Sequence, residues 1–122
     1  MNQFLLLILC LVSLTSVAQR FRWAQGASYY GSGGNGMAYY RSATDKHGNV
    51  YVTGYFTGTA NFGGGASGSV SSYGGRDIFL AKYDTTGALV WLTTAGSTGE
   101  DYGYSCAVDS ADNCYLVGTF SG

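Results

Sequence analysis

The chain of 122 residues is poor in charge and contains no proline. Six basic and seven acidic side chains leave a net charge near −1 at pH 7, so no basic stripe is available to contact the phosphate backbone of a nucleic acid. There is no block of like charge and no basic amphipathic segment of the kind that binds membrane surfaces. His47 is the single histidine, which excludes a metal site built on two histidines.

Outside the first eighteen residues, no stretch carries the apolar stripe with a period of 3.6 residues that marks an amphipathic helix. Glycine is abundant instead, with 20 residues, and there are 11 tyrosines. This composition suits strands joined by tight turns. A high glycine content also occurs in disordered chains, but the β-prone runs here can bury enough apolar surface to offset chain entropy. The composition therefore predicts an all-β protein.

The amino-terminal apolar run is too short for a membrane span. It covers residues 4–12, whereas about 20 apolar residues are needed to cross a bilayer. A small-x-small cleavage site ending at Ala18 follows it, as in a secretory signal peptide, although only the amino terminus supplies positive charge before the run. We therefore expect residues 1–18 to be a signal peptide cleaved after Ala18. The mature chain, residues 19–122, would be secreted or displayed at the cell surface, with no membrane span.

The most informative pattern is an internal repeat. Residues 45–58 and 109–122 share six identities, each separated by 64 positions. The matched pairs are Asp45/Asp109, Asn49/Asn113, Tyr51/Tyr115, Gly54/Gly118, Phe56/Phe120 and Gly58/Gly122. Self-similarity at a long fixed offset marks a repeat architecture. The chain holds about one and a half copies of this repeat, the second of them truncated.

Turns of the Asp-x-x-Gly kind separate alternating β-prone runs. They begin at Asp45, Asp84 and Asp109, and Gly48 and Gly87 close the first two. In such a turn the Asp side chain bonds the backbone two residues on, and Gly adopts the positive φ. The pattern predicts three consecutive hairpins. Their strands are expected at residues 38–44 with 49–56, 77–83 with 88–94, and 104–108 with 113–120.

The segment between the first two hairpins, residues 57–76, contains a Gly/Ser tract typical of a flexible surface loop. Two hairpins and this loop make one unit of four antiparallel strands, as in a propeller blade. The strand around Trp91 has a counterpart around Trp23, at residues 19–25, which would belong to another blade of a ring closed by a swapped strand. The sequence thus predicts about one and a half four-stranded blades of an incomplete β-propeller over residues 19–122.

Two cysteines, Cys106 and Cys114, remain in the mature chain. They flank a turn and so lie on neighbouring strands, which makes a disulfide possible in an exported protein. Directly opposite residues are within bridging reach, whereas a diagonal pair needs backbone movement. Ser42 and Val50 stand at the matching positions of the first copy, so a bridge is not part of the repeat. Two buried thiols are the alternative.

The order and spacing of these motifs resemble the SBBP (seven-bladed β-propeller) repeat family, whose members are mainly secreted or cell-surface bacterial proteins. The resemblance covers nearly all of residues 23–122. It rests on Asp-x-x-Gly-Asn-Val-Tyr-Val-Thr-Gly at 45–54, Asn-Phe-Gly-Gly at 61–64, Asp-Ile-Phe-Leu-Ala-Lys-Tyr-Asp-x-x-Gly at 77–87, Trp91, and Gly-Glu-Asp-Tyr-Gly at 99–103. The sequence departs from the repeat pattern of this family at Ala111-Asp112 and Cys114. The resemblance implies a propeller fold and supplies no catalytic motif.

The glycine and carboxylate motifs of the chain do not predict a ligand site. The run at residues 31–36 matches G-x-G-x-x-G, but a β-prone segment follows it where dinucleotide binding requires a helix. Asp45, His47 and Asn49 alternate like calcium ligands, yet Val50 stands where the calcium loop needs glycine. Turn chemistry explains Asp45 and Asn49 without a metal. We therefore expect no bound metal and no cofactor.

Catalytic groups are not indicated either. His47 at a hairpin tip would be solvated, unlike the oriented imidazole of a catalytic triad. Glu100 and Asp101, as neighbours on a strand, would point to opposite faces rather than converge as an acid–base pair. Asp101 is expected to cap a glycine-rich loop. The tyrosines fit cross-strand packing, although one or two at a propeller mouth could bind a ligand.

These patterns favour an exported, non-enzymatic β-propeller repeat module that binds or scaffolds an unidentified protein or carbohydrate. One alternative is the amino-terminal part of a propeller enzyme, a polysaccharide hydrolase or lyase with its active site in other blades. Another is a small self-assembling lectin. A ring of four to eight such blades needs about 256 to 512 residues. The expected partners are therefore the remaining blades of the same propeller or further copies of the chain.

Overall fold

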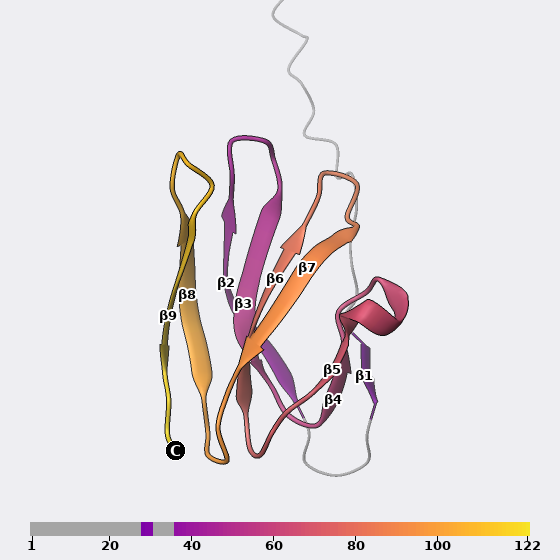
Figure 1. Cartoon of the computed structure of the whole chain (residues 1–122), viewed down its shortest axis with the longest axis vertical. Coiled ribbons are helices and arrows are strands. Elements are labelled where there is room, and N and C mark those ends of the chain that lie inside the picture. The colour runs from indigo at the N-terminus through magenta and orange to yellow at the C-terminus, as the bar shows by residue number, and fades with distance from the viewer. Residues whose placement is uncertain (1–27, 31–35) are drawn as a thin grey trace, which may run out of the picture.

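A computed structural model of the chain describes residues 28–30 and 36–122. The expected signal peptide, the strand around Trp23 and most of the glycine-rich run at 31–36 lie outside the described residues. The described part is all-β, as the sequence predicts, and its one helical element is a single short 3-10 segment (Figure 1). The elements are β1 (Ser28–Tyr30), β2 (Met37–Thr44), β3 (Val50–Phe56), β4 (Thr59–Asn61), η1 (Gly65–Gly68), β5 (Ser69–Ser71), β6 (Asp77–Tyr83), β7 (Leu89–Ala95), β8 (Tyr102–Val108) and β9 (Cys114–Thr119).

All three predicted hairpins are present, with strand ends within two residues of those expected. β2–β3 and β6–β7 join through the β3–β6 pairing into an antiparallel sheet of order β2-β3-β6-β7, the four-stranded unit that the repeat predicted. β6 is its most buried strand, because only Lys82 among its seven residues is more than slightly exposed. β8–β9 forms the third hairpin. All three hairpin turns lie at the same end of the molecule (Figure 1).

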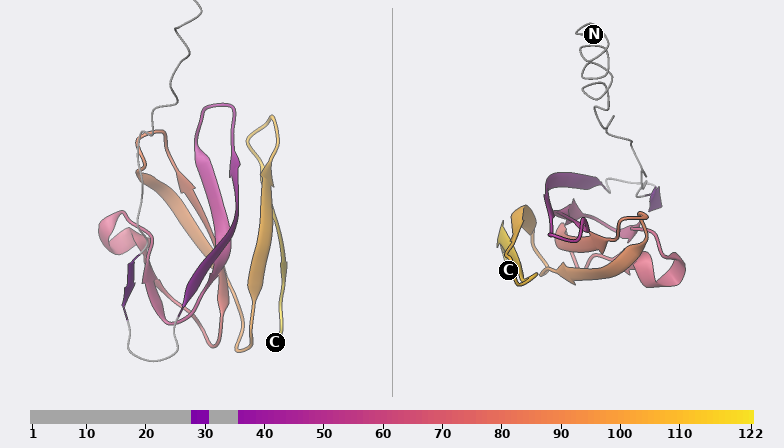
Figure 2. Two further views of the ribbon diagram at one scale, coloured as in Figure 1. Left: turned by 180° about the vertical axis from the view of Figure 1, so that it is seen from behind. Right: turned by 90° about the horizontal axis from the view of Figure 1, so that it is seen from above.

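The β8–β9 hairpin repeats β2–β3 in register as well as in sequence. Each pair has one register shift, between Tyr39 and Arg41 in the first copy and between Gly103 and Ser105 in the second, 64 positions apart. The second hairpin faces the first sheet rather than extending it (Figure 2). This arrangement, one four-stranded sheet followed by a two-stranded hairpin, is compatible with partial propeller blades and forms no closed ring among the described residues.

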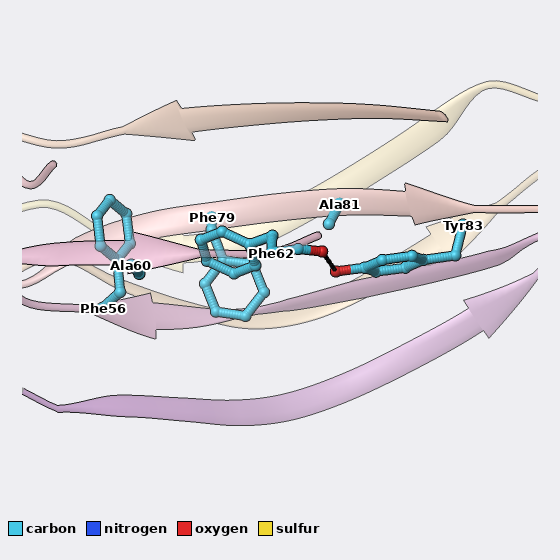
Figure 3. Packing of buried hydrophobic residues seen from close by; sticks show 6 residues of the cluster. All are labelled: Phe56, Ala60, Phe62, Phe79, Ala81 and Tyr83. Atoms are coloured by element: carbon cyan, nitrogen blue, oxygen red, sulfur yellow. Dashed lines mark hydrogen bonds between the residues drawn. The ribbon is translucent and has the colours of Figure 1, made fainter. Parts of the chain in front are cut away.

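Residues 57–76 differ from the expected flexible loop. They contain β4, η1 and β5, and these strands form a three-stranded sheet of order β1-β4-β5. The segment is ordered by Phe62, which is fully buried in the main core cluster of Phe56, Ala60, Phe62, Phe79, Ala81 and Tyr83 (Figure 3). The Tyr83 hydroxyl donates a hydrogen bond to the Phe62 carbonyl at 2.7 Å. Apolar side chains on either side of η1, with Phe62 the largest, thus hold this segment against the sheet.

The opposite face of the first sheet carries a second, smaller cluster of Tyr51, Leu80 and Cys106. Cys106 belongs to β8, so this cluster joins the second hairpin to the first sheet. Gly103 makes the closest approach, because a Cβ there would lie 2.6 Å from Thr53 Oγ1 and 2.7 Å from Ile78 Cγ2. The lack of a side chain at Gly103 therefore sets the distance between the two layers. Among the described residues, no helix is long and apolar enough to cross a membrane.

Candidate functional site

The Asp45 turn has the hydrogen bonds expected from its sequence. Asp45 Oδ1 accepts from the backbone amides of His47 and Asn49, both at 2.9 Å. Asp45 Oδ2 accepts from Asn49 Nδ2 at 2.7 Å and from the Tyr51 hydroxyl at 3.3 Å. Gly48 closes the turn with a φ of 83°, a value that glycine adopts without steric cost. The repeated Asp, Gly, Asn and Tyr are thus one interacting set.

The Asp109 turn reproduces this set in the second copy. Its Oδ1 accepts from the amides of Ala111 and Asn113 at 2.8 and 2.9 Å, and its Oδ2 accepts from Asn113 Nδ2 at 2.9 Å and the Tyr115 hydroxyl at 3.1 Å. Asp112 takes the place of Gly48 with a φ of 65°. The sequence departure at this position therefore leaves the turn geometry unchanged.

The Asp84 turn has a related but smaller set. Its Oδ1 accepts from the Thr86 amide at 2.8 Å, the Thr86 hydroxyl at 2.6 Å and the Ala88 amide at 3.0 Å. Gly87 closes it with a φ of 86°. The Thr86 side-chain bond and these amides lower the pKa of Asp84. All three turns are thus stabilised by an ionised aspartate.

Asp45 differs from the other turn aspartates in its surroundings. Its side chain is fully buried, and the Lys82 ammonium lies 3.3 Å from Oδ2 and 4.9 Å from the Tyr51 ring centroid. Burial opposes ionisation of Asp45, but the bonds from Asn49, His47 and Lys82 outweigh it and lower its pKa. Trp91 of β7 meets the same Tyr51 ring edge-on at 5.8 Å. These contacts account for the carboxylate without a metal.

The repeated glycines Gly54 and Gly118 lie beside the register shifts. A Cβ at Gly54 would lie 1.8 Å from the Ala38 carbonyl oxygen, and one at Gly118 would lie 2.4 Å from the Tyr102 carbonyl oxygen. These distances are far below any van der Waals contact, so a side chain is excluded at both positions. The two glycines allow the hairpin strands to approach where the bulges occur.

Cys106 and Cys114 are free thiols in this structure. Cys106 is opposite Leu116, and Cys114 is opposite Val108, so the two cysteines are a diagonal pair, the arrangement that requires backbone movement to bridge. Burial raises the pKa of both thiols. Both pack in or against the cluster between the two layers, where they act as small apolar side chains.

The structure gathers four tyrosines and an arginine that sequence reasoning did not single out. We call the set Tyr40, Tyr55, Tyr102, Tyr104 and Arg76 the tyrosine surface. Ring centroids lie 5.7 Å apart for Tyr40–Tyr55, 5.9 Å for Tyr40–Tyr104, 5.2 Å for Tyr55–Tyr102 and 6.0 Å for the stacked pair Tyr102–Tyr104. The set spans the junction between β2–β3 and β8. Its rings therefore form one continuous aromatic network across the two layers.

Arg76 contacts two of the four rings of the tyrosine surface. Its guanidinium carbon is 5.0 Å from the Tyr55 ring centroid and 5.5 Å from that of Tyr102, within range of cation–π attraction. It donates to the Tyr102 hydroxyl at 2.6 Å and pairs with Glu100. Asp101 instead accepts from the Ser97 amide at 2.6 Å and from Ser121. Glu100 and Asp101 thus have separate partners, and Asp101 caps a loop as expected.

The repeat contained a signal for this surface. Tyr40 and Tyr104 are 64 positions apart, and each is the extra residue of its register shift. A bulge leaves one residue without a cross-strand partner and redirects its side chain. Tyr40 and Tyr104 are 43% and 46% exposed, so both side chains are accessible to solvent. A search for tyrosines at the repeat offset would have found them.

No metal-binding cluster is found in the part of the chain that the structure describes. It contains no group of three or more His, Cys, Asp or Glu side chains that could hold a metal ion. His47 is exposed at its hairpin tip, and its Nε2 lies 3.5 Å from Asp112 Oδ2 of the neighbouring turn. Lys46 of the same turn donates to the Ser110 carbonyl at 2.9 Å. These contacts link the tips of the two repeat copies.

Comparison with known proteins gives a partial similarity. The chain is 36% identical over 53 residues to an uncharacterized WD repeat-containing protein, L264, of Acanthamoeba polyphaga mimivirus. The match covers 43% of this chain but only 4% of that protein. No family model matches the chain, and no solved structure matches it. The similarity is to a repeat protein of the propeller type, in agreement with the all-β fold and the internal repeat.

Proposed function

We propose that the chain is an exported, non-enzymatic β-propeller repeat module of the SBBP type that binds a protein or carbohydrate ligand outside the cell. Three observations support its propeller character: the offset of 64, the four-stranded antiparallel sheet and the similarity to a WD repeat-containing protein. Export rests on the apolar run and the cleavage site ending at Ala18. Binding rests on a single feature, the tyrosine surface.

The tyrosine surface has the physical properties of a binding platform. Tyr40 and Tyr104 are partly exposed aromatic side chains with hydroxyl groups, so they offer apolar contact and hydrogen bonds together. Their rings are held by neighbouring rings, which lowers the entropy lost when a ligand is bound. Arg76 and Glu100, both partly exposed, add charged hydrogen-bonding groups beside the rings. Sugar rings and peptide side chains both match this combination of groups.

The test compares two variants of the secreted chain. Tyr40→Ala/Tyr104→Ala removes the exposed rings, whereas Tyr73→Ala removes a tyrosine that is 78% exposed and lies outside the surface. Panels of neutral oligosaccharides and of peptides serve as probes, and binding is followed through the tyrosine ring signals in NMR spectra. Losing two rings should lower the affinity for the bound class by roughly tenfold or more, since each aromatic contact contributes about 0.5–1.5 kcal/mol.

Several results would contradict the proposal. Equal loss of affinity in the Tyr73→Ala control would show that the tyrosine surface is not the site. Binding of neither probe class by the native chain would remove the binding function. Recovery of the chain from cells with its amino terminus at Met1, rather than Gln19, would contradict export. Circular dichroism of both variants checks that the β-fold is intact.

A further inference from the structure

The guanidinium of Arg76 is held in one position by contacts with its neighbours. Its central carbon lies 5.0 Å from the Tyr55 ring centroid and 5.5 Å from that of Tyr102, and its Nη1 donates to the Tyr102 hydroxyl at 2.6 Å. The Arg76 carbonyl accepts from the Asp101 amide at 2.7 Å, which fixes the backbone as well. An arginine that is already positioned loses little conformational freedom when it receives an anion, and its planar fork matches a carboxylate.

The Glu100 side chain occupies the place that a carboxylate ligand would take beside this arginine. Glu100 Oε2 accepts from Arg76 Nη1 and, at 3.4 Å, from the Tyr102 hydroxyl. The first repeat copy has Gly36 at the position of Glu100, so the repeat fold does not require this carboxylate. The chain itself thus shows that a carboxylate fits between Arg76 and Tyr102.

The Glu100 side chain can leave this place without a change in the backbone. Its amide donates to Ser121 Oγ, and its carbonyl accepts from the same hydroxyl, both at 2.8 Å. These bonds hold the main chain whichever way the side chain points. The Glu100 and Arg76 side chains are 51% and 39% exposed, and an ion pair between exposed groups contributes little to stability. A second carboxylate can therefore compete with Glu100 for Arg76.

The tyrosine surface also has hydrogen-bond donors to spare. Arg76 uses only its Nη1 in hydrogen bonds to described residues, which leaves its Nε and Nη2 for a ligand. The hydroxyls of Tyr40 and Tyr55 make no hydrogen bond within the described part of the chain. Glu100 is the single carboxylate in contact with this set. A ligand rich in acceptor oxygens matches the surface better than one rich in donors.

We propose that the ligand of the tyrosine surface is an acidic saccharide, and that Glu100 is an internal occupant of the subsite for its carboxylate. A hexuronate ring carries a carboxylate next to an apolar C–H face. Its carboxylate displaces Glu100 and binds Arg76 and the Tyr102 hydroxyl, while its ring packs against Tyr40 or Tyr104. A neutral sugar has no group that replaces Glu100. Glu100 and Arg76 thus determine the specificity for acid.

The composition of the surface favours a saccharide over an acidic peptide. Acidic and phosphorylated peptide motifs are recognised by clusters of arginines, whereas Arg76 is the single cation among four tyrosines here. One cation beside several rings matches a sugar, which presents one carboxylate for each apolar ring face. This inference rests on the proposed function, because it names the ligand class of the same surface.

The experiment uses three probes on the full chain in isothermal titration calorimetry. They are tetragalacturonate, its methyl ester and a tetraglutamate peptide. The ester keeps the shape and the apolar faces of the acid but has no charge. We expect the acid to bind at least about fivefold more tightly than the ester and than the peptide, since a carboxylate–arginine contact is charge-assisted. NMR should show shifted signals for the Arg76 guanidinium and the Tyr102 ring.

Variants test the two specificity residues. Glu100→Gln removes the internal competitor, so it should raise the affinity for tetragalacturonate by about twofold to fivefold, the range that exposed ion pairs contribute. Arg76→Gln should abolish the preference for the acid over the ester. Asp112→Asn is the matched control, because it removes one carboxylate from the exposed pair with Lys46 at the hairpin tips and should leave the affinity for both sugars unchanged. Circular dichroism checks the fold of each variant.

Each failure has its own result. Equal affinity for the acid and the ester, both reduced by Tyr40→Ala/Tyr104→Ala, would overturn the acidic ligand and keep the proposed binding function. An affinity for the acid that changes no more in Glu100→Gln than in Asp112→Asn would show that Glu100 does not occupy the subsite. Tighter binding of tetraglutamate than of tetragalacturonate would make the ligand a peptide. Binding of none of these probes and of no neutral sugar or peptide would overturn both proposals.

Discussion

At the scale of single residues, the two repeat copies contain the same aspartate turn in different surroundings. Asp45 and Asp109 make the same four hydrogen bonds within their own turns. Asp45 additionally pairs with Lys82 and is buried, whereas Asp109 has no cation partner among the described residues. The second copy thus serves as an internal control for the first. A difference in stability between equivalent variants of Asp45 and Asp109 therefore measures the effect of the Lys82 pairing rather than that of the turn.

We expect Asp45→Ala to lower the midpoint of thermal unfolding by more than Asp109→Ala at pH 7. Both variants remove a turn aspartate, but only Asp45→Ala leaves the Lys82 ammonium, 17% exposed, without its carboxylate. Circular dichroism melting curves of the three proteins measure the difference. Equal shifts for the two variants would show that the Lys82 pair contributes nothing to stability.

The stability of the native chain should also decrease at acidic pH. The pKa of Asp45, Asp84, Asp101 and Asp109 is lower in the folded chain than the ordinary carboxyl value. A lowered pKa means that the folded state favours the ionised form, so this stabilisation is complete above about pH 4 and is lost as the pH falls towards the folded-state values. The difference in unfolding midpoint between the native chain and Asp45→Ala should therefore become smaller as the pH falls from about 4 to about 2 in the same melting curves. A gap that widens in acid would contradict this sign.

At the scale of elements, contact between the two layers depends on the absence of one side chain. Gly103 brings β8 against Thr53 and Ile78, and the apolar contacts of Cys106 with Tyr51 and Leu80 follow from that distance. The first copy has Tyr39 at this position, and its ring meets Phe79 edge-on at 5.4 Å on the other face of the sheet. The β2–β3 and β8–β9 hairpins thus differ in packing because Tyr39 of the first corresponds to Gly103 of the second.

We expect Gly103→Ala to lower the free energy of unfolding by about 1–3 kcal/mol, the usual cost of overpacking a contact. The added methyl would meet Thr53 Oγ1 and Ile78 Cγ2, and the second hairpin would have to move away. Urea unfolding followed by circular dichroism measures the change. Gly36→Ala is the matched control, since nothing lies within 4 Å of a Cβ at Gly36. A similar loss in both variants would refute the steric explanation.

The elements also show what the sequence could and could not predict. Asp-x-x-Gly turns between alternating runs locate all three hairpins, because a turn's chemistry is local and repeats at a fixed offset. The β4–β5 segment was missed because its composition is that of a loop, and its order depends on the burial of Phe62 against Phe79, whose rings lie 4.6 Å apart. The contacts of the tyrosine surface were missed in the same way, since they join residues from β2, β3 and β8, and only the offset of 64 between Tyr40 and Tyr104 indicated them. Long-range contacts of this kind have no local signature.

At the scale of the whole molecule, the two repeat copies have the same hairpin fold but differ in strand pairing and in burial. β3 is paired on both edges, covered by Phe62 on one face and by β8 on the other. β9 is paired on one edge, and its outward-facing Tyr115 and Val117 are exposed. Burial and pairing on both edges raise the free energy needed to open a strand locally. The described structure should therefore be stable at the first sheet and labile at the second hairpin.

This asymmetry predicts the order of amide hydrogen exchange. Backbone amides of β3 and β6 should exchange most slowly, and those of β9 should exchange at least about tenfold faster, because opening a two-stranded hairpin disrupts fewer contacts. Native-state exchange followed by NMR measures each strand in one experiment. Equal protection of β3 and β9 would mean that the exposed face of β9 is covered by contacts between chains, and the light-scattering mass of the same sample would then exceed that of a monomer.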